Sequence, residues 1–329
     1  MDLDVVFLGT AGSMPTAQRA PSATLLRRGG ERLLFDCGEG TQRQLLRSAV
    51  GLLELREVFV SHFHADHYLG LPGMLKTFAL RGRDLPITIY GPRGLRDLFS
   101  SLRRIFGKLT YEYELVELTP GDILDRGDYE LAAFEVRHSV TALGFALTEA
   151  PRPGRFDVAA ADALGVPSGP ERGALQRGEA VTLVDGRAIA PDDVLGPPRP
   201  GRKVVLAGDT AYSSAVVAAA RGADLLVHEA TFCEEERDRA AETSHSTAAD
   251  AAQVALEAEV AVLAVTHLSP RYFGPDVAAE ARAIFPETVV PRDFDVIEVP
   301  FPERGPPRLL KAAAAAPKRQ PEPAPAEVP

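Results

Sequence analysis

Three histidines and an aspartate fall within six residues, as His62-x-His64-x-Asp66-His67, directly after the apolar run EVFVS at 57–61. Histidine accounts for only seven of the 329 residues, so this density is a strong signal of metal chemistry. Residues two apart at the end of a strand point the same way, so His62 and His64 can hold one metal ion, and Asp66 and His67 can face a second. Imidazole and carboxylate ligands suit zinc (Zn²⁺), with manganese (Mn²⁺) or iron (Fe²⁺) as alternatives. The simpler interpretation is a run of surface histidines beside an acidic residue.

Two metal ions need more ligands than this motif supplies, and three candidates stand at the ends of apolar runs. His138 ends YELAAFEVRH, Asp209 ends KVVLAGD, and His267 ends VAVLAVTH. Each has an ordinary explanation when taken alone, because an aspartate before a threonine is commonly a turn or cap residue. Together these groups can converge on one edge of a sheet, which is where open α/β sheets place their sites.

The two remaining histidines, His228 and His245, occur together with a glutamate. Glu229 follows His228 at the expected end of a strand, and His245 precedes a predicted helix in TSHSTAADAA. Glu229 and His245 can form a proton relay, in which the carboxylate fixes the tautomer of the imidazole and raises its basicity. The alternative for His245 is a helix-entry residue between Ser244 and Ser246.

The segments that must position these residues alternate between strands and helices. Short apolar runs predict strands at 3–9, 57–61, 86–91, 111–118, 128–139, 203–209, 223–230 and 260–268. The segment 23–38 predicts a hairpin with its turn at Gly29-Gly30. Predicted helices cover 40–50, 93–105, 213–220, 246–258 and 276–284. This alternation predicts an α/β fold.

Composition places the chain among ordinary globular proteins. Hydrophobic residues make up 45% and charged residues 25%, which excludes a wholly disordered or fibrous chain. Cys37 and Cys233 are too few for a disulfide framework or a cysteine-based zinc site. No apolar run approaches the roughly 18 residues of a membrane helix. The start MDLDVVFLGT has acids where a secretory signal carries Lys or Arg, so we expect a cytoplasmic protein without a membrane partner. The net charge of -10 argues, as a bulk statistic, against nucleic-acid binding.

Two stretches differ from this body. Residues 151–202 are rich in proline and glycine with weak periodicity, which predicts a flexible, loop-rich arm. Its seven arginines balance seven acidic residues. Residues 303–329 form an Ala/Pro-rich tail that cannot bury a core and is expected to be disordered. The expected organisation is therefore one folded domain over 1–302, interrupted by the arm and followed by the tail.

Nine segments of the chain resemble ribonuclease Z, the tRNA 3′-processing endonuclease family of the metallo-β-lactamase superfamily. They are FLGTAGSMPTAQRAPS, FDCGEGTQRQL, SHFHADHYLGLPG, VRHSVTALGFALTE, LGVPSGPERGALQRGE, VVLAGDT, HEATF, SHSTAADAA and HLSPRY, in the family's order across residues 7–272. The His-x-His-x-Asp-His motif marks only the superfamily, whereas HEATF, SHST, HLSPRY and the arm are more specific. The resemblance implies a four-layer αββα sandwich of the α/β (α+β) class, with the arm as an exosite.

The resemblance also implies roles for individual residues. The implied ligands of two Zn²⁺ ions per subunit are His62, His64 and His138 on one ion, Asp66, His67 and His267 on the other, and Asp209 bridging them. Asp66 is the family's assigned proton acceptor, but a zinc-bound carboxylate is a poor base, so we interpret it as orienting the attacking hydroxide. Glu229 and His245 would steady or protonate the leaving 3′ oxygen. Arg271 and Arg19 would contact the substrate, Arg271 by meeting a phosphate.

The implied activity is zinc-dependent removal of the 3′ trailer from precursor tRNA, which leaves a 3′-hydroxyl on the tRNA and a 5′-phosphate on the trailer. A single set of motifs is typical of the family's short form, a homodimer in which the arm of one subunit holds RNA for the site of its partner. Local basic residues would then supply phosphate contacts, namely Arg27, Arg28, Arg32, Arg81, Arg83, Arg103, Arg104 and Lys108. Three positions depart from the family's pattern, because Ala20, Thr141 and Phe145 stand where Asn, Ser and Tyr are common.

Two other functions are compatible with the same residues. A small-molecule phosphodiesterase, or a thioesterase or lactonase, would use the same metal ligands and would lack activity on precursor tRNA. A non-catalytic RNA-binding protein would keep the fold, but such proteins usually lose ligands and no member of the set is missing here.

Overall fold

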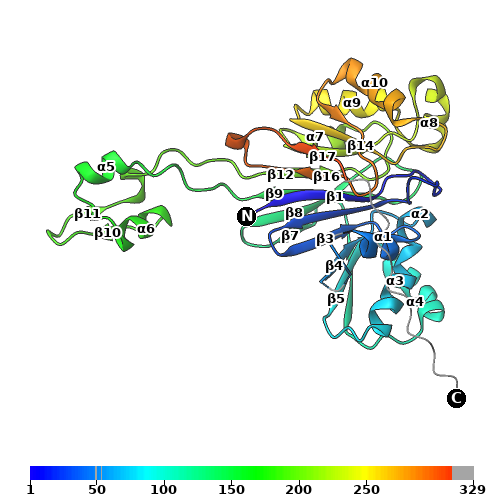
Figure 1. Ribbon diagram of the computed structural model, residues 1–329, viewed down its shortest axis with the longest axis horizontal. Coiled ribbons are helices and arrows are strands. Elements are labelled where there is room, and N and C mark those ends of the chain that lie inside the picture. Colours follow the sequence, from blue (N-terminus) through cyan, green and yellow to red (C-terminus); the bar gives the residue numbers. More distant parts are fainter. Residues whose placement is uncertain (49, 53, 313–329) are drawn as a thin grey trace.

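The computed structural model describes residues 1–48, 50–52 and 54–312, and it confirms the four-layer αββα sandwich (Figure 1). An eight-stranded and a seven-stranded sheet pack face to face, and helices cover their outer faces. The inner faces bury one apolar core to which both sheets contribute, with Val5 and Phe59 from the first and Phe145 and Leu225 from the second. Burial of these apolar faces is what holds the two sheets together.

The eight-stranded sheet has the order β17-β16-β1-β2-β3-β4-β5-β6. Its strands are β1 (Leu3–Gly9), β2 (Ala23–Arg28), β3 (Glu31–Phe35), β4 (Glu57–Phe59), β5 (Ile87–Pro92), β6 (Tyr113–Leu118), β16 (Val296–Glu298) and β17 (Arg308–Leu310). The predicted hairpin is confirmed, because β2 and β3 pair in antiparallel fashion and Gly29 adopts a φ of 55° in the turn. Strands β3 to β6 are parallel, so their carboxyl ends meet at one edge.

The seven-stranded sheet has the order β15-β14-β13-β12-β9-β8-β7. Its strands are β7 (Ile123–Asp125), β8 (Tyr129–Glu135), β9 (Leu143–Glu149), β12 (Lys203–Leu206), β13 (Leu225–Glu229), β14 (Val262–Thr266) and β15 (Thr288–Val289). Strands β12 to β15 are parallel, whereas β9 runs antiparallel to β12. The arm therefore begins at the end of β9 and returns at the start of β12.

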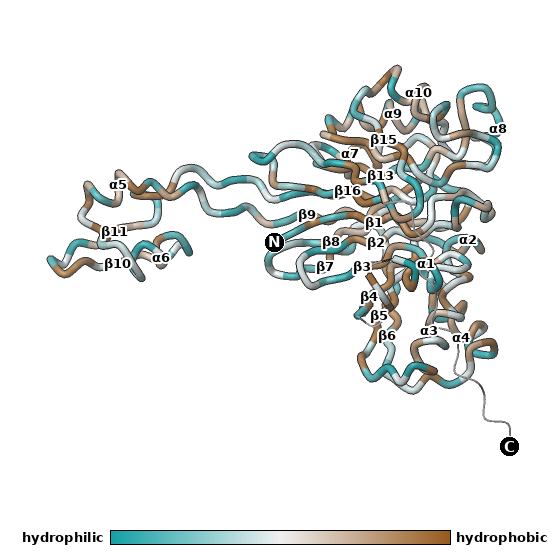
Figure 2. The backbone as a smooth tube through the Cα atoms, in the orientation of Figure 1, coloured by the Kyte–Doolittle hydropathy of each residue, from teal (hydrophilic) through white to brown (hydrophobic). Residues whose placement is uncertain are grey.

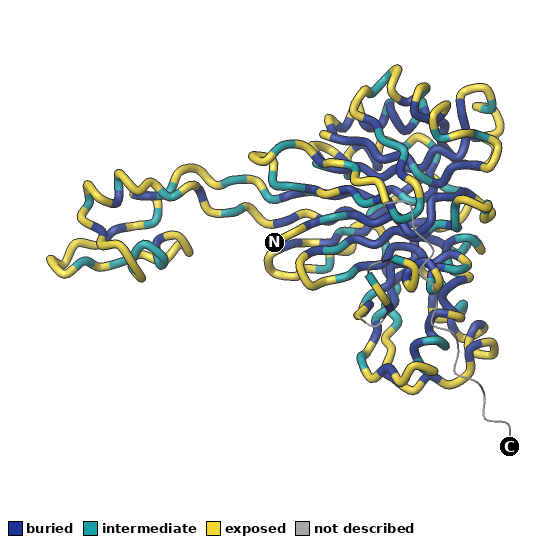
Figure 3. The backbone as a smooth tube through the Cα atoms, in the orientation of Figure 1, coloured by how far each residue is buried: buried dark blue, intermediate teal, exposed yellow. Residues whose placement is uncertain are grey.

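Helices form the two outer layers (Figure 1). The helices of the body are α1 (Thr41–Arg47), α2 (Ala65–Tyr68), α3 (Gly70–Leu80), α4 (Leu95–Phe106), α7 (Ser214–Ala220), α8 (Arg237–Thr243), α9 (Ala248–Glu257) and α10 (Gly274–Ile284), with a 3₁₀ turn η2 at Glu234–Glu236. Helices α1, α3 and α4 bury apolar side chains against the first sheet, and α7, α9 and α10 against the second (Figure 3). Within the described ranges, every helix is too short or too polar to cross a bilayer.

The segment 151–202 leaves the sandwich as an arm with a small folded unit at its end (Figure 1). The unit consists of α5 (Val158–Ala163), α6 (Pro170–Gln176), β10 (Val181–Thr182), β11 (Ala188–Ile189) and the 3₁₀ turn η1 (Pro191–Asp193). It has a miniature core of its own, made of Ala161, Val166, Leu175, Ile189 and Val194. Figure 2 shows short apolar stretches among hydrophilic ones in this unit. The loop-rich prediction missed this unit because two-residue strands and one- to two-turn helices carry almost no periodic signal.

Order continues further beyond Pro302 than the sequence suggests. The 3₁₀ turn η3 covers Pro302–Arg304, and β17 pairs with β16 through Leu309 opposite Ile297. The expectation of disorder from residue 303 is therefore wrong for residues 303–312, because RLL extends the edge of the first sheet. The rest of that tail, 313–329, lies outside the described residues.

Candidate metal centre

All the proposed chemistry gathers along one edge of the sandwich, just beyond the ends of five strands. His62 follows β4, and His138 follows β8. Asp209 lies three residues after β12 ends at Leu206, Glu229 is the last residue of β13, and His267 follows β14. The apolar strands are held in the core, so the polar residues that come next are brought out at a common edge. The structure therefore brings these strand-end residues together, as the sequence predicts.

The first group of potential ligands comprises His62, His64 and His138, whose nitrogens lie within 4.8 Å of one another. His64 Nδ1 lies 3.1 Å from His138 Nε2. Zn–N bonds of about 2.0–2.1 Å place two ligand atoms of a tetrahedral ion about 3.3 Å apart, so this spacing suits a shared ion. The Nδ1–H of His138 donates to the carbonyl of Ser244 at 3.0 Å, which leaves Nε2 free to bind.

The second group comprises Asp66, His67 and His267, again within 4.8 Å. Oδ2 of Asp66 lies 3.4 Å from His67 Nε2 and 3.2 Å from His267 Nε2. Although burial alone would raise the pKa of Asp66, the neighbouring imidazoles of His267 and His67 hold it well below its usual range. Asp66 is therefore ionised at neutral pH, as a ligand must be.

Asp209 lies between the two groups and faces both. Its Oδ2 is 3.2 Å from His67 Nε2, 3.4 Å from His267 Nε2 and 3.9 Å from His62 Nε2. The side chain is almost fully buried, with an exposed fraction of 4%. A carboxylate so placed can offer one oxygen to each of two neighbouring ions.

Three supporting residues had no role in the sequence analysis. Asp36 accepts a hydrogen bond from His67 Nδ1 at 2.7 Å and another from Ser61 Oγ at 3.0 Å, while Ser61 Oγ lies 3.0 Å from His62 Nδ1. Thr231 Oγ1 lies 2.8 Å from His267 Nδ1. Each contact uses the Nδ1 atom and directs Nε2 toward the centre, the arrangement that orients metal-bound imidazoles.

The donor set fits divalent metal ions. His62 Nε2 and His67 Nε2 are buried and have no hydrogen-bond partner among the described residues. Unpaired polar atoms are costly in a protein interior, so two such atoms that face the same carboxylate call for an ion. The pKa of His62 is lowered to about 2, mainly by burial and next by His67, so its imidazole is neutral and able to bind. Nitrogen and carboxylate ligands without thiolates favour zinc, manganese or iron.

Glu229 and His245 form a pair beside the centre. His245 Nδ1 lies 2.6 Å from Glu229 Oε1, and Glu229 Oε2 accepts a bond from Thr231 Oγ1 at 2.6 Å. Burial disfavours the charged imidazole, but the neighbouring Glu229 carboxylate outweighs it and raises the pKa of His245 to about 9. A protonated imidazole held by a buried carboxylate can give a proton to a leaving group. The ring of His245 also stacks on His267, with centroids 5.6 Å apart.

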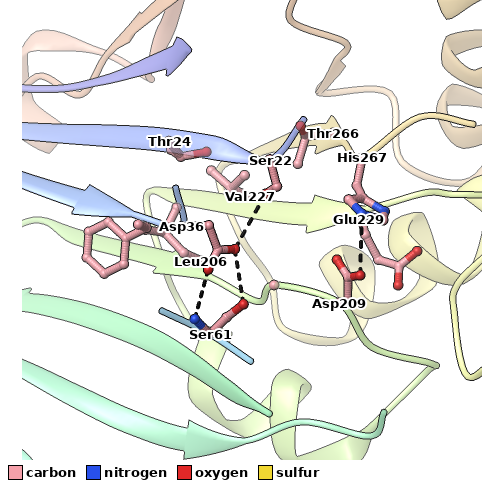
Figure 4. A pocket seen from close by; sticks show the side chains of 12 residues that line it. Ser22, Thr24, Asp36, Ser61, Leu206, Asp209, Val227, Glu229, Thr266 and His267 are labelled. Atoms are coloured by element: carbon pink, nitrogen blue, oxygen red, sulfur yellow. Dashed lines mark hydrogen bonds and ion pairs between the residues drawn. The ribbon is translucent and has the colours of Figure 1, made fainter. Parts of the chain in front are cut away.

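A small cavity with both polar and apolar lining residues lies behind the centre, between the two sheets (Figure 4). Its volume is about 40 Å³, and Asp36, Ser61, Asp209, Glu229 and His267 are among its lining residues. The close-up shows Asp36 bonded to Ser61, with Asp209, Glu229 and His267 gathered beyond them. Two of the proposed ligands, Asp209 and His267, therefore border the same space as the supporting residues Asp36 and Ser61.

The remaining sequence candidates have other surroundings. The guanidinium of Arg19 donates to Thr10 Oγ1 at 2.6 Å and to the carbonyl of Pro291 at 2.9 Å, which ties it to the protein. Arg271 is half exposed, and its Nη1 lies 4.0 Å from Glu236 Oε2. His228 is fully buried, and its Nδ1–H donates to the carbonyl of Glu229 at 2.8 Å. Among these three, only Arg271 presents its charge at the surface.

Two of the arginines proposed for phosphate contacts bind acidic or carbonyl groups inside the sandwich. Arg28 pairs with Glu149 and Asp128 at 2.9 and 2.7 Å, and Arg83 donates to backbone carbonyls that include that of Leu55. These two are buried, so the prediction that they bind RNA is wrong. Arg81, Arg103, Arg104 and Lys108 are exposed.

Comparisons with known proteins find a family model and several similar sequences. A family model described as "Anti-Pycsar protein Apyc1" matches residues 3–146, which is under half of the chain. The chain is 45% identical to the ribonuclease Z of Methanosarcina acetivorans over 303 residues, which covers 91% of this chain and 99% of that relative. It is 49% identical to the ribonuclease Z of Myxococcus xanthus over 271 residues, covering 82% of this chain and 88% of the relative.

Solved structures of other proteins are similar to this chain over most of its length. The crystal structure of the short form of human tRNase Z is similar with a TM-score of 0.66 and 30% identity, covering 90% of this chain and 99% of that one. The metallo-β-lactamase fold protein YhfI from Bacillus subtilis has a TM-score of 0.67 at 21% identity, covering 91% and 100%, which shows the shared fold. The extent of these matches, together with the strand-end site, shows that the chain belongs to the ribonuclease Z family of metal-dependent endoribonucleases.

Proposed function

We propose that this protein is a two-zinc endoribonuclease that removes the 3′ trailer from precursor tRNA, leaving a 3′-hydroxyl on the tRNA and a 5′-phosphate on the trailer. The observation that carries the proposal is Asp209, whose single carboxylate faces both groups of ligand nitrogens. A carboxylate shared in this way would keep two ions close together, and two close ions can stabilise both the attacking and the leaving oxygen of a displacement at phosphorus.

The ligands divide into two sets in this proposal. His62, His64 and His138 would hold one ion, Asp66, His67 and His267 would hold the other, and Asp209 would be shared between them. When bound, two such ions lower the pKa of a water molecule and neutralise charge on the phosphate oxygens. Zinc is the preferred ion because every nitrogen ligand is an imidazole, and Mn²⁺ or Fe²⁺ would be accepted by the same set.

The chain's own groups orient the reactants and move a proton. Asp66 accepts a hydrogen bond from the backbone N–H of Ser13 at 2.9 Å, which fixes its carboxylate and lets it orient the attacking water. His245, charged through Glu229, donates a proton to the leaving 3′ oxygen. Thr231 bonds Glu229 and contacts His267 Nδ1, so it couples the orientation of the proton donor to that of the ligand.

Recognition of the RNA is assigned to surfaces outside the metal centre. In this proposal the arm binds the body of the tRNA, the protein acts as a homodimer in the cytoplasm, and Arg271 meets a phosphate near the centre. The arm's balanced charges suit recognition of RNA shape through a few arginines and backbone amides. Exposed Arg103, Arg104 and Lys108 add positive charge on the sandwich despite the net charge of -10.

The decisive assay incubates the zinc-loaded protein with one precursor tRNA and maps the new 3′ end, with and without an encoded CCA. The expected result is a cut after the discriminator nucleotide and a trailer with a 5′-phosphate. Bis(p-nitrophenyl) phosphate serves as the comparison substrate. Hydrolysis of that diester with intact precursor tRNA would replace this proposal with a small-molecule phosphodiesterase.

A further inference from the structure

The arm leaves the sandwich on a narrow stalk, which consists of the two chain segments 152–156 and 195–199. Its two chains pair only through isolated bridges, Arg152 with Arg199 and Phe156 with Leu195. Between these bridges they pass so closely that a Cβ on Gly154 would lie 1.8 Å from the carbonyl oxygen of Gly196. An isolated two-stranded ribbon is marginally stable in water, so this stalk needs support from the body to keep one direction.

That support comes from the turn η3 and the residue before it. Glu303 receives two hydrogen bonds from the guanidinium of Arg152, at 3.0 and 2.9 Å, and one from Arg199 at 3.1 Å. The carboxylate of Glu303 therefore binds one arginine from each chain of the stalk. Hydrogen bonds from Arg152 lower the pKa of Glu303 to about 2, so it is ionised at neutral pH.

Phe301, the residue before η3, makes a second contact with the base of the arm. The guanidinium of Arg152 lies 3.5 Å from the centre of its ring and that of Arg202 lies 4.1 Å from it. Arg202 is itself fixed, because it donates to Glu149 and to the carbonyl of Val299. In Figure 1 the orange turn after β16 lies beside the green chains where they leave the sandwich.

We propose that Phe301 and Glu303 form a clasp that fixes the direction of the arm, and that Glu303 is a positioning residue for precursor tRNA. The inference rests on the proposed function, because the clasp matters to catalysis only if the arm holds RNA. A small rotation at the base of the arm displaces RNA bound at its far end by a larger distance. A reacting phosphate displaced by about 1 Å costs on the order of 100-fold in rate.

The clasp variant is Glu303→Gln, which removes the charge and keeps the shape of the side chain. Its matched control is Glu179→Gln on the arm, which breaks an exposed pair with Arg177 and leaves the stalk untouched. A second clasp variant, Phe301→Leu, removes the ring and keeps the carboxylate. Thermal unfolding of all three confirms that any effect occurs in a folded protein.

The direct readout is a distance between spin labels on the arm and on the sandwich. Labels are introduced at Val184→Cys, fully exposed on the arm, and at Glu130→Cys, exposed on β8. The native Cys37 and Cys233 are buried. Labelled chains are diluted with unlabelled protein so that only distances within one subunit are measured. We expect a narrow distribution in the unmodified protein and in Glu179→Gln, and a broad one in both clasp variants.

The catalytic readout compares two substrates. We expect Glu303→Gln to lower kcat/KM for precursor tRNA by about 10-fold or more and to change hydrolysis of bis(p-nitrophenyl) phosphate less than 2-fold. An unchanged distance distribution, or equal losses on both substrates, would overturn the clasp. If the unmodified protein does not cut precursor tRNA, the proposed function fails, while the distance measurement still decides whether the clasp fixes the arm.

Discussion

At the scale of single residues, the centre depends on backbone conformations that side chains rarely adopt. His267 and Asp36 have φ values of 58° and 60°, in the left-handed region that favours glycine. Gly12 makes this possible for His267, because a Cβ at position 12 would lie 2.6 Å from the carbonyl oxygen of His267 and 2.9 Å from its Nδ1. Strain of this kind persists where a function requires the side chain in one place.

Replacement of Gly12 by alanine should therefore displace His267. We expect Gly12→Ala to reduce the metal content of the purified protein and its cleavage rate together. The control is Gly30→Ala, because a Cβ there meets nothing within 4 Å. Metal analysis and a cleavage assay of both variants check this; full metal content and full rate in Gly12→Ala would contradict the packing argument.

The division between ligands and proton donor gives a second prediction at this scale. His245→Ala should keep its metal and slow the chemical step by about 100-fold or more, the usual contribution of a positioned proton donor. The neighbouring Glu242→Gln, exposed on α8, is the control and should leave the rate unchanged. Single-turnover cleavage and metal analysis separate the two roles. Loss of metal from His245→Ala would show that His245 is a ligand.

The sequence alone predicted which residues gather at the centre and missed how they are held. The seven proposed ligands were identified because a dense motif and polar strand ends are local signals. Asp36, Ser61 and Thr231 were missed as supports, because their contacts to His67, His62 and His267 exist only after folding. Asp36, for example, lies 31 residues from His67 in sequence.

At the scale of elements, buried ion pairs connect the strands from which the arm leaves the sandwich. Glu149 ends β9 and accepts hydrogen bonds from Arg202, which precedes β12, at 2.7 and 2.8 Å, and from Arg28 at 2.9 Å. The exposed fractions of the Glu149 and Arg202 side chains are 5% and 2%. Removing one partner from a buried pair leaves an uncompensated charge, which usually costs about 3–5 kcal/mol.

Glu149→Gln should therefore destabilise the fold in a pH-dependent way. Burial opposes ionisation, but the hydrogen bonds and charge of Arg202 prevail and lower the pKa of Glu149. Its contribution is then fully present above the unfolded pKa of about 4.3 and is lost as pH falls through the lower folded pKa. Urea unfolding of both proteins should show a difference that is largest above pH 5 and shrinks below pH 4. A difference independent of pH would contradict this account.

Element prediction succeeded where a strand lies in a clear apolar run, since it found the three-residue β4 within EVFVS, but it missed the seven-residue β9. The runs at 3–9, 203–209 and 260–268 contain the strands β1, β12 and β14, because strands buried on both faces are nearly continuous apolar runs. The edge strand β17 and the arm's unit were missed, because isolated strands of two or three residues and helices of one or two turns carry almost no periodic signal.

At the scale of the whole molecule, metal chemistry and RNA binding are assigned to separate parts. Replacing residues 155–195 by a short Gly/Ser linker removes the arm's unit and keeps every proposed ligand. Metal binding and hydrolysis of bis(p-nitrophenyl) phosphate should persist, whereas kcat/KM for precursor tRNA should fall about tenfold for each 1.4 kcal/mol of lost contact. Equal loss on both substrates would mean that the arm serves folding alone.

The same variant also tests the homodimer. If the arm of one subunit serves the site of its partner, mixing the armless protein with an arm-intact Asp209→Ala protein should restore part of the tRNA cleavage. Neither protein alone is expected to support efficient cleavage. Absence of any restoration in a mixture shown to exchange subunits would place arm and site within one chain.

The central claim is that Asp209 bridges two metal ions, and anomalous X-ray diffraction at the zinc edge tests it most directly. Crystals of the zinc-loaded protein should show two anomalous peaks per chain. One peak should lie beside His62, His64 and His138, the other beside Asp66, His67 and His267, and each within about 2.0–2.2 Å of a carboxylate oxygen of Asp209. A single peak, or two peaks without Asp209 as a shared ligand, would contradict the account.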